Sequence, residues 1–350
     1  MKKITALLLS FMLSINLSGC YDTKEISEIA FVIAVGFDQN DYTFQIVKPS
    51  AFEGDSAEDS PLLTKTISAK NIYDAMDKLN SQISEVCDFS HMKIVVFSND
   101  VAKSGIEKQV DAMLKSSDFH PNIKVAMCEG KVSDYMKDME IPLNTNPAEY
   151  YENIFSHKFT QYSPDTRLKD LQKNYSSHIK GCAIPIINAE KGMAITSDYK
   201  LTGRANAENT LIYNMLKNPD FDGNFTISDS IVVNLKKTQC NFDINTNVTP
   251  TNITVKIKLE GNVKWDESNT DMATIQKQAK ENTENKVKNF LYSCSNYYKA
   301  DIFDFYKIAK KHYPTLESWE GANWQQLFEN ASYNVTVDVN IKREGYKLKE

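Results

Sequence analysis

The spacing of apolar residues along this chain follows two different patterns, and it changes from one to the other near residue 203. Before that point short apolar runs alternate with segments whose apolar residues recur every three or four positions. The run from Ile29 to Val35 predicts a strand buried on both faces. Tyr42, Phe44 and Ile46 alternate with polar residues, which predicts a half-buried strand paired with the first as a hairpin. We expect further strands at 62–67, 93–97 and 123–127, and helices at 71–86, capped by Asn71, and around 106–113. This alternation is typical of an α/β layer.

The middle of the chain continues the pattern with shorter elements. A helix is predicted from about Asn146 to Lys158, and a second short one around Leu168 and Leu171. The run from Ala183 to Ile187 contains Pro185, so we expect an edge or terminal strand there.

Beyond Gly203 the strands are longer and alternate regularly. After a helix at 205–216, four runs place apolar side chains at every second position: 231–235, 240–244, 253–259 and 335–341. Polar residues fill the intervening positions, as in an antiparallel sheet covered on one side. Helices are expected between the third and fourth runs, at 275–291 and 302–313. The sequence therefore predicts an α+β protein, with one or more N-terminal mixed α/β domains over residues 20–198. A C-terminal domain over 199–350 would pack an antiparallel sheet against helices.

The first nineteen residues have the pattern of an export signal. Lys2 and Lys3 precede an apolar run, Ile4 to Leu17, that is too short to span a membrane. It ends in Leu17-Ser18-Gly19-Cys20, which matches the lipobox of bacterial lipoproteins. We therefore expect residues 1–19 to be removed and the Cys20 thiol to carry a diacylglyceryl lipid as the membrane anchor.

A second resemblance begins at the same cysteine. Gly19-Cys20-Tyr21-Asp22, then Glu25, then Ala34-Val35-Gly36-Phe37-Asp38 resembles the opening of the spore germinant receptor C subunits, with Tyr21 where that family usually has tryptophan. Later segments fit the same family in order: Ser90-His91-Met92-Lys93, Phe119-His120-Pro121, Ile184-Pro185-Ile186, Ala300-Asp301-Ile302-Phe303, Tyr313-Pro314, Trp319, Trp324 and Phe328, and a last strand ending at Gly345.

This resemblance implies a non-enzymatic lipoprotein subunit of a nutrient germinant receptor. Its partners would be the membrane-spanning A and B subunits, and it would lie on the outer leaflet of the inner spore membrane. It would be required for the germination response to nutrients such as amino acids or sugars.

Charge narrows the choice of partners. The full chain of 350 residues has a net charge of −6. Removing residues 1–19 takes away Lys2 and Lys3 and no acidic residue, which leaves 38 basic against 46 acidic residues, a net charge of −8. Nucleic acids and anionic headgroups both reward clusters of lysine and arginine. We therefore expect no nucleic-acid partner, and we expect the lipid on Cys20 to hold the chain on the membrane without a polybasic segment.

Cysteines and histidines give no pattern of catalysis or metal binding. The other five cysteines, at 87, 128, 182, 240 and 294, are widely spaced and include no Cys-x-x-Cys pair, so they are expected to be mostly buried apolar residues. One long-range disulfide stays open as an alternative in an exported protein. The five histidines, at 91, 120, 157, 178 and 312, have no metal-site spacing. We predict no catalytic residue, no metal and no cofactor.

Two alternatives remain at this stage. A solute-binding lipoprotein that captures a small nutrient would need two similar lobes, whereas the two halves of this chain differ in pattern. Trp319 and Trp324 would form either an exposed binding platform or part of the core, and we favour the core. The strand that contains Gly36 is predicted to be central in a membrane-proximal domain, with the glycine permitting a close backbone approach or a bulge.

Overall fold

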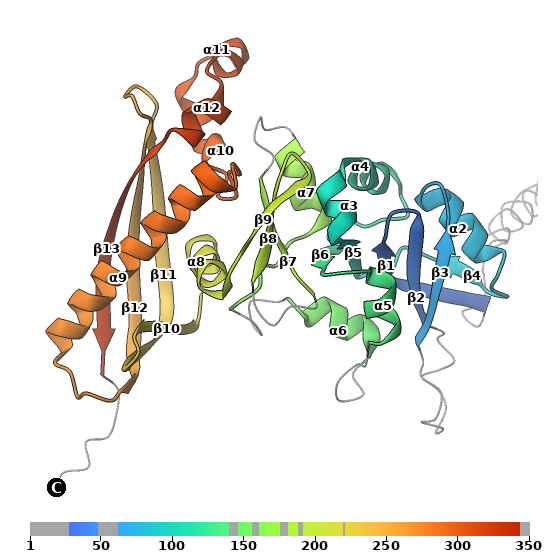
Figure 1. The fold of residues 1–350 in the computed structure, drawn as a ribbon, viewed down its shortest axis with the longest axis horizontal. Coiled ribbons are helices and arrows are strands. Elements are labelled where there is room, and N and C mark those ends of the chain that lie inside the picture. Colours follow the sequence, from blue (N-terminus) through green and yellow to red (C-terminus); the bar gives the residue numbers. More distant parts are fainter. Residues whose placement is uncertain are drawn as a thin grey trace, which may run out of the picture.

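The computed structural model describes residues 28–47, 62–139, 146–155, 161–175, 181–187, 192–219 and 221–343. Figure 1 shows two bodies with a small sheet between them. The described chain enters at the end of the molecule remote from the C-terminal body.

The N-terminal body is built on a six-stranded mixed sheet in the order β3-β2-β1-β5-β6, with β4 also paired to β1. β1 is central: it pairs antiparallel with β2 and parallel with β5, which pairs parallel with β6. This confirms the predicted central strand and hairpin. The strands are β1 Ile29–Phe37, β2 Asp41–Val47, β3 Leu62–Ser68, β4 Val86–Asp88, β5 Ile94–Ser98 and β6 Lys124–Cys128.

Helices cover both faces of this sheet. One core contains apolar side chains of α2 Ile72–Asn80, α3 Asn99–Ser104, α4 Glu107–Lys115 and α7 Leu168–Tyr175, and the core on the opposite face contains those of α5 Val132–Lys137 and α6 Pro147–Asn153. The strand predicted at Tyr42 is present as β2, but the prediction that it is half-buried is wrong, since Thr43 and Gln45 are also fully buried. The Gln45 amide donates a hydrogen bond to the Met136 carbonyl of α5 at 3.0 Å, which satisfies this buried group.

The helix capped by Asn71 is shorter than its periodicity indicates. The Asn71 side chain accepts a hydrogen bond from the Asp74 backbone N–H at 3.0 Å, as expected of an N-cap. The helix ends at Asn80, whose side chain accepts a hydrogen bond from the Cys87 N–H at 3.0 Å. Val86, predicted as helical, therefore lies in β4, which extends the sheet beside Ile29.

The small middle sheet is an antiparallel meander of β7 Cys182–Pro185, β8 Met193–Ser197 and β9 Lys200–Ala205. β7 is an edge strand, as Pro185 predicts. A single parallel bridge from Met127 to Ile186 links it to β6 of the larger sheet.

The C-terminal body begins with α8 Ala207–Lys217 and contains a four-stranded sheet in the order β10-β11-β12-β13. The strands are β10 Gly223–Ser228, β11 Ile231–Asn245, β12 Asn252–Asp266 and β13 Ser332–Lys342. The two runs predicted at 231–235 and 240–244 form the single strand β11. A register shift between Leu235 and Lys237 moves the inward positions from odd to even numbers, which disguises the continuity in the sequence.

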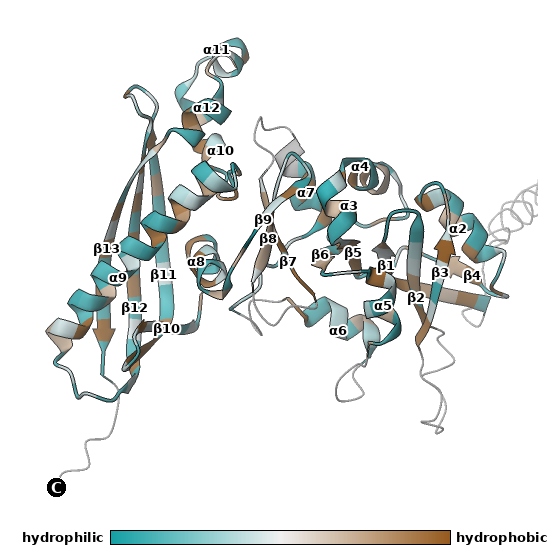
Figure 2. Cartoon of the chain, viewed as in Figure 1, coloured by the Kyte–Doolittle hydropathy of each residue, from teal (hydrophilic) through white to brown (hydrophobic). Residues whose placement is uncertain are grey.

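The last strand differs in direction from the prediction, because β13 pairs parallel with β12. A parallel neighbour requires a crossover connection, and here it contains α9 Met272–Tyr292, which packs along β13. The exposed face of α9 is largely hydrophilic in Figure 2. The sheet packs against helices as predicted, with an antiparallel part, β10 to β12, and one parallel edge strand.

Three short helices, α10 Phe305–Ala309, α11 Leu316–Gly321 and α12 Trp324–Glu329, complete this body at one end of the long strands (Figure 1). Trp319 and Trp324 lie on α11 and α12. Both are buried, with ring centroids 6.0 Å apart. The core interpretation of these tryptophans is confirmed.

Candidate functional site

The middle sheet lies between the two bodies, and its strands β7 and β8 are buried on both faces. Cys182 and Ile184 of β7 belong to the N-terminal core, whereas the intervening Ala183 belongs to the C-terminal core. β8 repeats this division, with Ala194 facing the N-terminal body and Ile195 facing the C-terminal body. Because each face is packed into a different core, the sheet couples the two bodies mechanically. We call this region the junction.

A turn of the C-terminal body, Tyr298 to Asp304, is seated on the middle sheet. The Ser197 hydroxyl donates a hydrogen bond to the Lys299 carbonyl at 2.9 Å, and the Tyr298 hydroxyl donates one to the Arg204 carbonyl at 2.8 Å. These two contacts connect segments about 100 residues apart. The turn contains the Ala300-Asp301 pair singled out in the sequence.

Two backbones approach each other closely in the junction. A Cβ atom on Gly181 would lie 2.7 Å from the backbone nitrogen and 2.9 Å from the carbonyl oxygen of Asp301. Real Cβ atoms do not approach other heavy atoms so closely. Glycine at position 181 therefore lets the turn contact the start of β7.

Asp301 holds the turn together from inside. Its side chain is only 1% exposed and accepts hydrogen bonds from the backbone N–H groups of Phe305 at 3.0 Å and Tyr306 at 2.8 Å. The Trp324 indole N–H donates a third bond at 3.4 Å. Burial raises the pKa of the Asp301 carboxyl to about 6, although the two backbone donors oppose the shift.

The raised pKa of Asp301 predicts a specific pH dependence of stability. The folded pKa of about 6 exceeds the reference value of 3.8, so between these pH values the folded state binds more protons than the unfolded state. Its free energy of unfolding should therefore fall as pH rises through this window, by at most about 3 kcal/mol. Asp301→Asn lacks the titrating group, so its stability relative to the wild type should improve over the same window. Urea unfolding at a series of pH values measures this, and a difference independent of pH would contradict it.

A cavity of about 230 Å³ lies in the junction between Asp165 and Asp170 on one side and Lys217, Asp304 and Lys307 on the other. Its charged side chains are bonded to protein partners. The Asp304 carboxylate takes the ammonium groups of Lys217 at 3.1 Å and Lys307 at 3.0 Å, and the Asp170 carboxylate accepts the Arg167 backbone N–H at 3.0 Å. A charged solute entering the cavity would have to compete with these partners.

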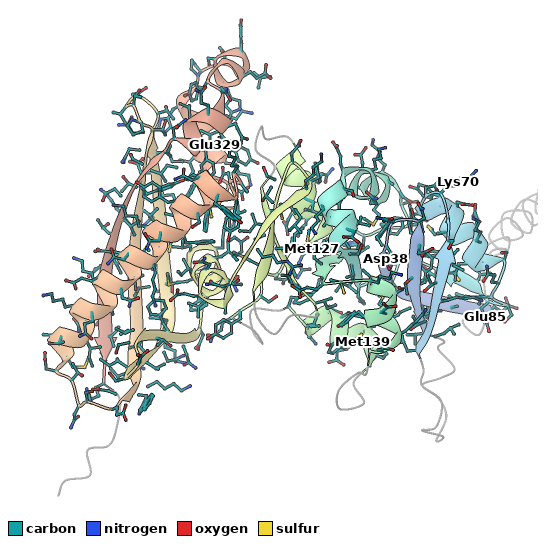
Figure 3. The ribbon with its side chains drawn as sticks, in the orientation of Figure 1. Asp38, Lys70, Glu85, Met127, Met139 and Glu329 are labelled. Atoms are coloured by element: carbon teal, nitrogen blue, oxygen red, sulfur yellow. The ribbon has the colours of Figure 1, made fainter. Side chains whose placement is uncertain are left out.

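The Ala34–Asp38 segment positions a helix in the N-terminal body. The Asp38 carboxylate, labelled in Figure 3, accepts hydrogen bonds from the backbone N–H groups of Val132 and Ser133 at 3.0 Å each. This carboxylate satisfies the first N–H groups of α5 and favours its dipole. Gly36 faces the Val132 side chain so closely that a Cβ atom would overlap it. The predicted close approach is confirmed, whereas the bulge in β1 lies between Val32 and Ala34.

The cysteines of the described chain are free thiols with structural surroundings. Cys87, Cys128, Cys182 and Cys294 are buried and Cys240 is partly buried, which confirms that most are core residues. Burial raises the pKa of the Cys87 thiol to about 11 and those of Cys128 and Cys240 to about 12. Thiols held protonated in this way are poor nucleophiles.

Several residues named from the sequence lie outside the described part of the chain: Cys20, Tyr21, Asp22, Glu25, His157 and His178. Within the described ranges, no three His, Cys, Asp or Glu side chains gather as metal ligands would. None of the helices in those ranges has the length and apolar character needed to cross a membrane.

Two of the segments quoted from the sequence converge where the sequence alone showed no relation. Ser90 to Lys93, His120 and the residues from Asn122 to Lys124 line one cavity of about 290 Å³, together with Glu152 and Arg167. Sequence reasoning treated His91 and His120 as scattered. No spacing rule connects them, because their proximity comes from the side-by-side starts of β5 and β6.

Comparisons with known proteins cover nearly the whole chain. A family model for the spore germination protein N-terminal domain matches residues 22–189, and a model for the spore germination B3/GerAC-like C-terminal domain matches residues 191–345. The putative spore germination protein YfkR of Bacillus subtilis (strain 168) is 19% identical over 386 aligned positions, with 99% of this chain and 98% of the relative covered. Spore germination protein KC of the same organism is 22% identical over 197 positions, 53% of this chain and 48% of that protein. The crystal structure of the GerBC protein superposes with a TM-score of 0.54 at 14% identity, covering 91% of this chain and 99% of that one, and shows a shared fold.

Proposed function

Because the chain belongs to the family of spore germinant receptor C subunits, we propose that it is the membrane-anchored lipoprotein subunit of a nutrient germinant receptor. It would work by assembly or signalling and not by catalysis. Its partners would be the membrane-spanning A and B subunits, on the outer leaflet of the inner spore membrane.

The observation that carries the anchoring part is the lipobox Leu17-Ser18-Gly19-Cys20. A lipid on Cys20 would place the start of β1 close to the bilayer, since the eight residues from Tyr21 to Glu28 reach at most about 26 Å when extended. Two or more acyl chains hold a protein firmly on a membrane, whereas one chain is marginal. Weak contacts with the membrane subunits would then act at a high effective concentration.

The junction supports a role in transmitting or holding a conformation. A sheet packed into two cores, with the Gly181 and Asp301 backbones in contact, resists independent motion of the two bodies. A partner that binds the C-terminal body would therefore be held in a fixed position relative to the membrane-proximal body. This is the mechanical property that an assembly subunit needs.

The solute-binding alternative has less support. The two bodies differ in topology, one with a six-stranded mixed sheet and the other with a four-stranded sheet. The junction cavity lies between them, but Lys217 and Lys307 there both pair with Asp304, and Asp165 and Asp170 line the same cavity, so its carboxylates outnumber its ammonium groups. A zwitterionic nutrient would gain little from groups that are already paired.

Substituting Cys20 tests the proposed anchoring. Cys20→Ala should leave the protein unprocessed or soluble and should abolish the germination response, because the acyl chains would be lost. The measurements are fractionation of cells that lack the other receptor subunits and, in a separate strain that keeps those subunits, germination assays on single nutrients. Ser18→Ala is the matched control, since it keeps a small residue in the lipobox and should behave as wild type. A Cys20→Ala protein that reaches the membrane in processed form would refute the anchor.

A further inference from the structure

The cavity at the start of β5 and β6 concentrates basic side chains in a chain that is acidic overall. Six charged or imidazole residues line it: His91, Lys93, His120, Lys124, Glu152 and Arg167. We call this site the basic pocket. Its apolar surroundings are the buried side chains of Met92 and Ile123. A volume of about 290 Å³ suits a small ligand or one headgroup.

The pocket is formed by backbone pairing at the amino ends of parallel strands. The Lys124 N–H donates to the Lys93 carbonyl at 2.9 Å, and the Lys93 N–H donates to the Ile33 carbonyl of β1 at 2.8 Å. These bonds fix the two lysines side by side on rigid elements. Arg167, the residue just before α7, lines the same pocket. The backbone N–H of the next residue, Leu168, donates a hydrogen bond to the Ile123 carbonyl at 2.9 Å.

Charge within the pocket is incompletely balanced. Lys124 is only 4% exposed, and its ammonium lies 2.8 Å from Asp165. The same carboxylate also takes Arg167 at 3.4 Å, so one negative charge serves two cations. Burying an ammonium group is costly unless it is compensated. The positive charge of Lys124 and Arg167 that Asp165 does not balance is therefore available to an anion.

Other donors in the pocket suit an oxygen-rich anion. His120 accepts the Asn122 N–H on Nδ1 at 3.1 Å, so the neutral ring carries its own proton on Nε2 and has a donor to offer. Lys93 pairs with Glu152 at 3.3 Å, but Glu152 is 64% exposed, and such exposed pairs are weak. Lysine and arginine together are the usual donors to phosphate oxygens.

The position of the pocket indicates where such an anion would come from. β1 is parallel to β5 and β6, so its start lies at the same end of the sheet as the pocket. Phe31, two residues into β1, contacts His91 with ring centroids 4.9 Å apart. The chain enters β1 from the segment that follows Cys20, so a lipid there would turn this end of the domain toward the bilayer.

We propose that the basic pocket binds a phosphate-type oxyanion, presented by the headgroup of an anionic phospholipid in the membrane to which the chain is anchored. The oxyanion chemistry rests on the pocket itself. The choice of a headgroup over a phosphate in solution rests on the proposed anchoring. A headgroup contact would fix the orientation of the N-terminal body, which the tether alone leaves open.

The test uses the chain from Cys20 onward with Cys20→Ala, made without a lipid, so that its outcome does not depend on lipidation. Flotation with vesicles of phosphatidylglycerol and phosphatidylcholine should recover the protein, and phosphatidylcholine vesicles alone should not. The double variant Lys93→Gln/Arg167→Gln, which spares the buried Lys124, should lower the partition coefficient by roughly tenfold at low salt. Lys256→Gln/Lys258→Gln is the matched control, because it removes two exposed charges from β12 and should have little effect.

Three results would overturn the proposal in distinguishable ways. Equal losses in the two double variants would mean that binding follows net charge and not the pocket. A saturable thermal shift with inorganic phosphate, absent in Lys93→Gln/Arg167→Gln and without any vesicle binding, would replace the headgroup by a ligand in solution. No response to either vesicles or phosphate would remove the oxyanion site altogether, whatever the result for Cys20.

Discussion

Replacing Gly36 by valine is expected to unfold the N-terminal body. Gly36 lies in β1, between Val35 and Phe37, which are both buried. A Cβ atom there would overlap Val132 of α5 and would lie 3.1 Å from the Met136 sulfur. Overpacking a core by one group costs about 1–3 kcal/mol, and valine adds two further methyl groups into the same space. That loss is a large fraction of the stability of a typical domain, about 5–15 kcal/mol.

Circular dichroism and urea unfolding of Gly36→Ala and Gly36→Val would measure this effect, with valine the more severe. Gly321→Ala is a matched control, since a Cβ atom at the end of α11 meets nothing within 4 Å. In cells, Gly36→Val should retain lipid attachment, because Cys20 precedes the folded domain, but should fail to assemble. A Gly36→Val protein with wild-type stability would show that α5 does not pack on β1 as described.

Gly181→Ala should weaken the contact between the two bodies. The atoms that the new methyl group would meet are the backbone nitrogen, carbon and oxygen of Asp301, at 2.7, 2.8 and 2.9 Å. A side chain can rotate away from such a clash, but a backbone must shift as a unit. The Asp301 backbone is also held by the hydrogen bonds of its own side chain to α10. We expect a loss of about 1–3 kcal/mol.

Limited proteolysis and the shape of the unfolding transition separate this effect from simple destabilisation. Coupled bodies should unfold together in the wild type, whereas Gly181→Ala should unfold in two steps or be cleaved between the bodies. Ser197→Ala is the control, because it removes one exposed hydrogen bond from the same junction and should cost about 1 kcal/mol or less. If Gly181→Ala kept a single transition at the wild-type midpoint and germinated normally, the junction would not be the coupling element.

The two glycine variants also separate two contributions to function. Gly36→Val removes the body next to the proposed anchor, whereas Gly181→Ala leaves both bodies folded and alters their connection. A germination defect in Gly181→Ala, with the amount of protein unchanged, would point to coupling as the property that matters.

Local patterns in the sequence were sufficient for most individual elements. The unbroken apolar run at Ile29 predicted a strand covered on both faces, and Asn71 predicted a helix start, because both depend on neighbours only a few residues away. The helix that follows Asn71 was predicted too long, since Val86 continues the apolar spacing but is taken by β4. The apolar character of Trp319 and Trp324 likewise placed them in a core.

Features that depend on distant partners were decided by the tertiary structure. The bulge at Leu235 to Lys237 joins two runs into one strand, and α9 returns the chain so that β13 pairs in parallel with β12. Thr43 and Gln45 are buried because α5 and α6 cover the face that their polarity assigned to solvent.

The chemistry divides in the same way. The sequence by itself determined the lipobox at Cys20 and the family, because both are read from short motifs and their order along the chain. The net charge of −8 for the chain without residues 1–19 gave no sign of a basic site, because a net charge does not say which charged side chains lie close together in the fold. Folding alone brings Lys93, Lys124 and Arg167 together at the starts of parallel strands, and it alone buries Asp301 against the backbone of Gly181. Strand pairing sets these proximities, and pairing between segments far apart in the sequence leaves no local periodicity to read.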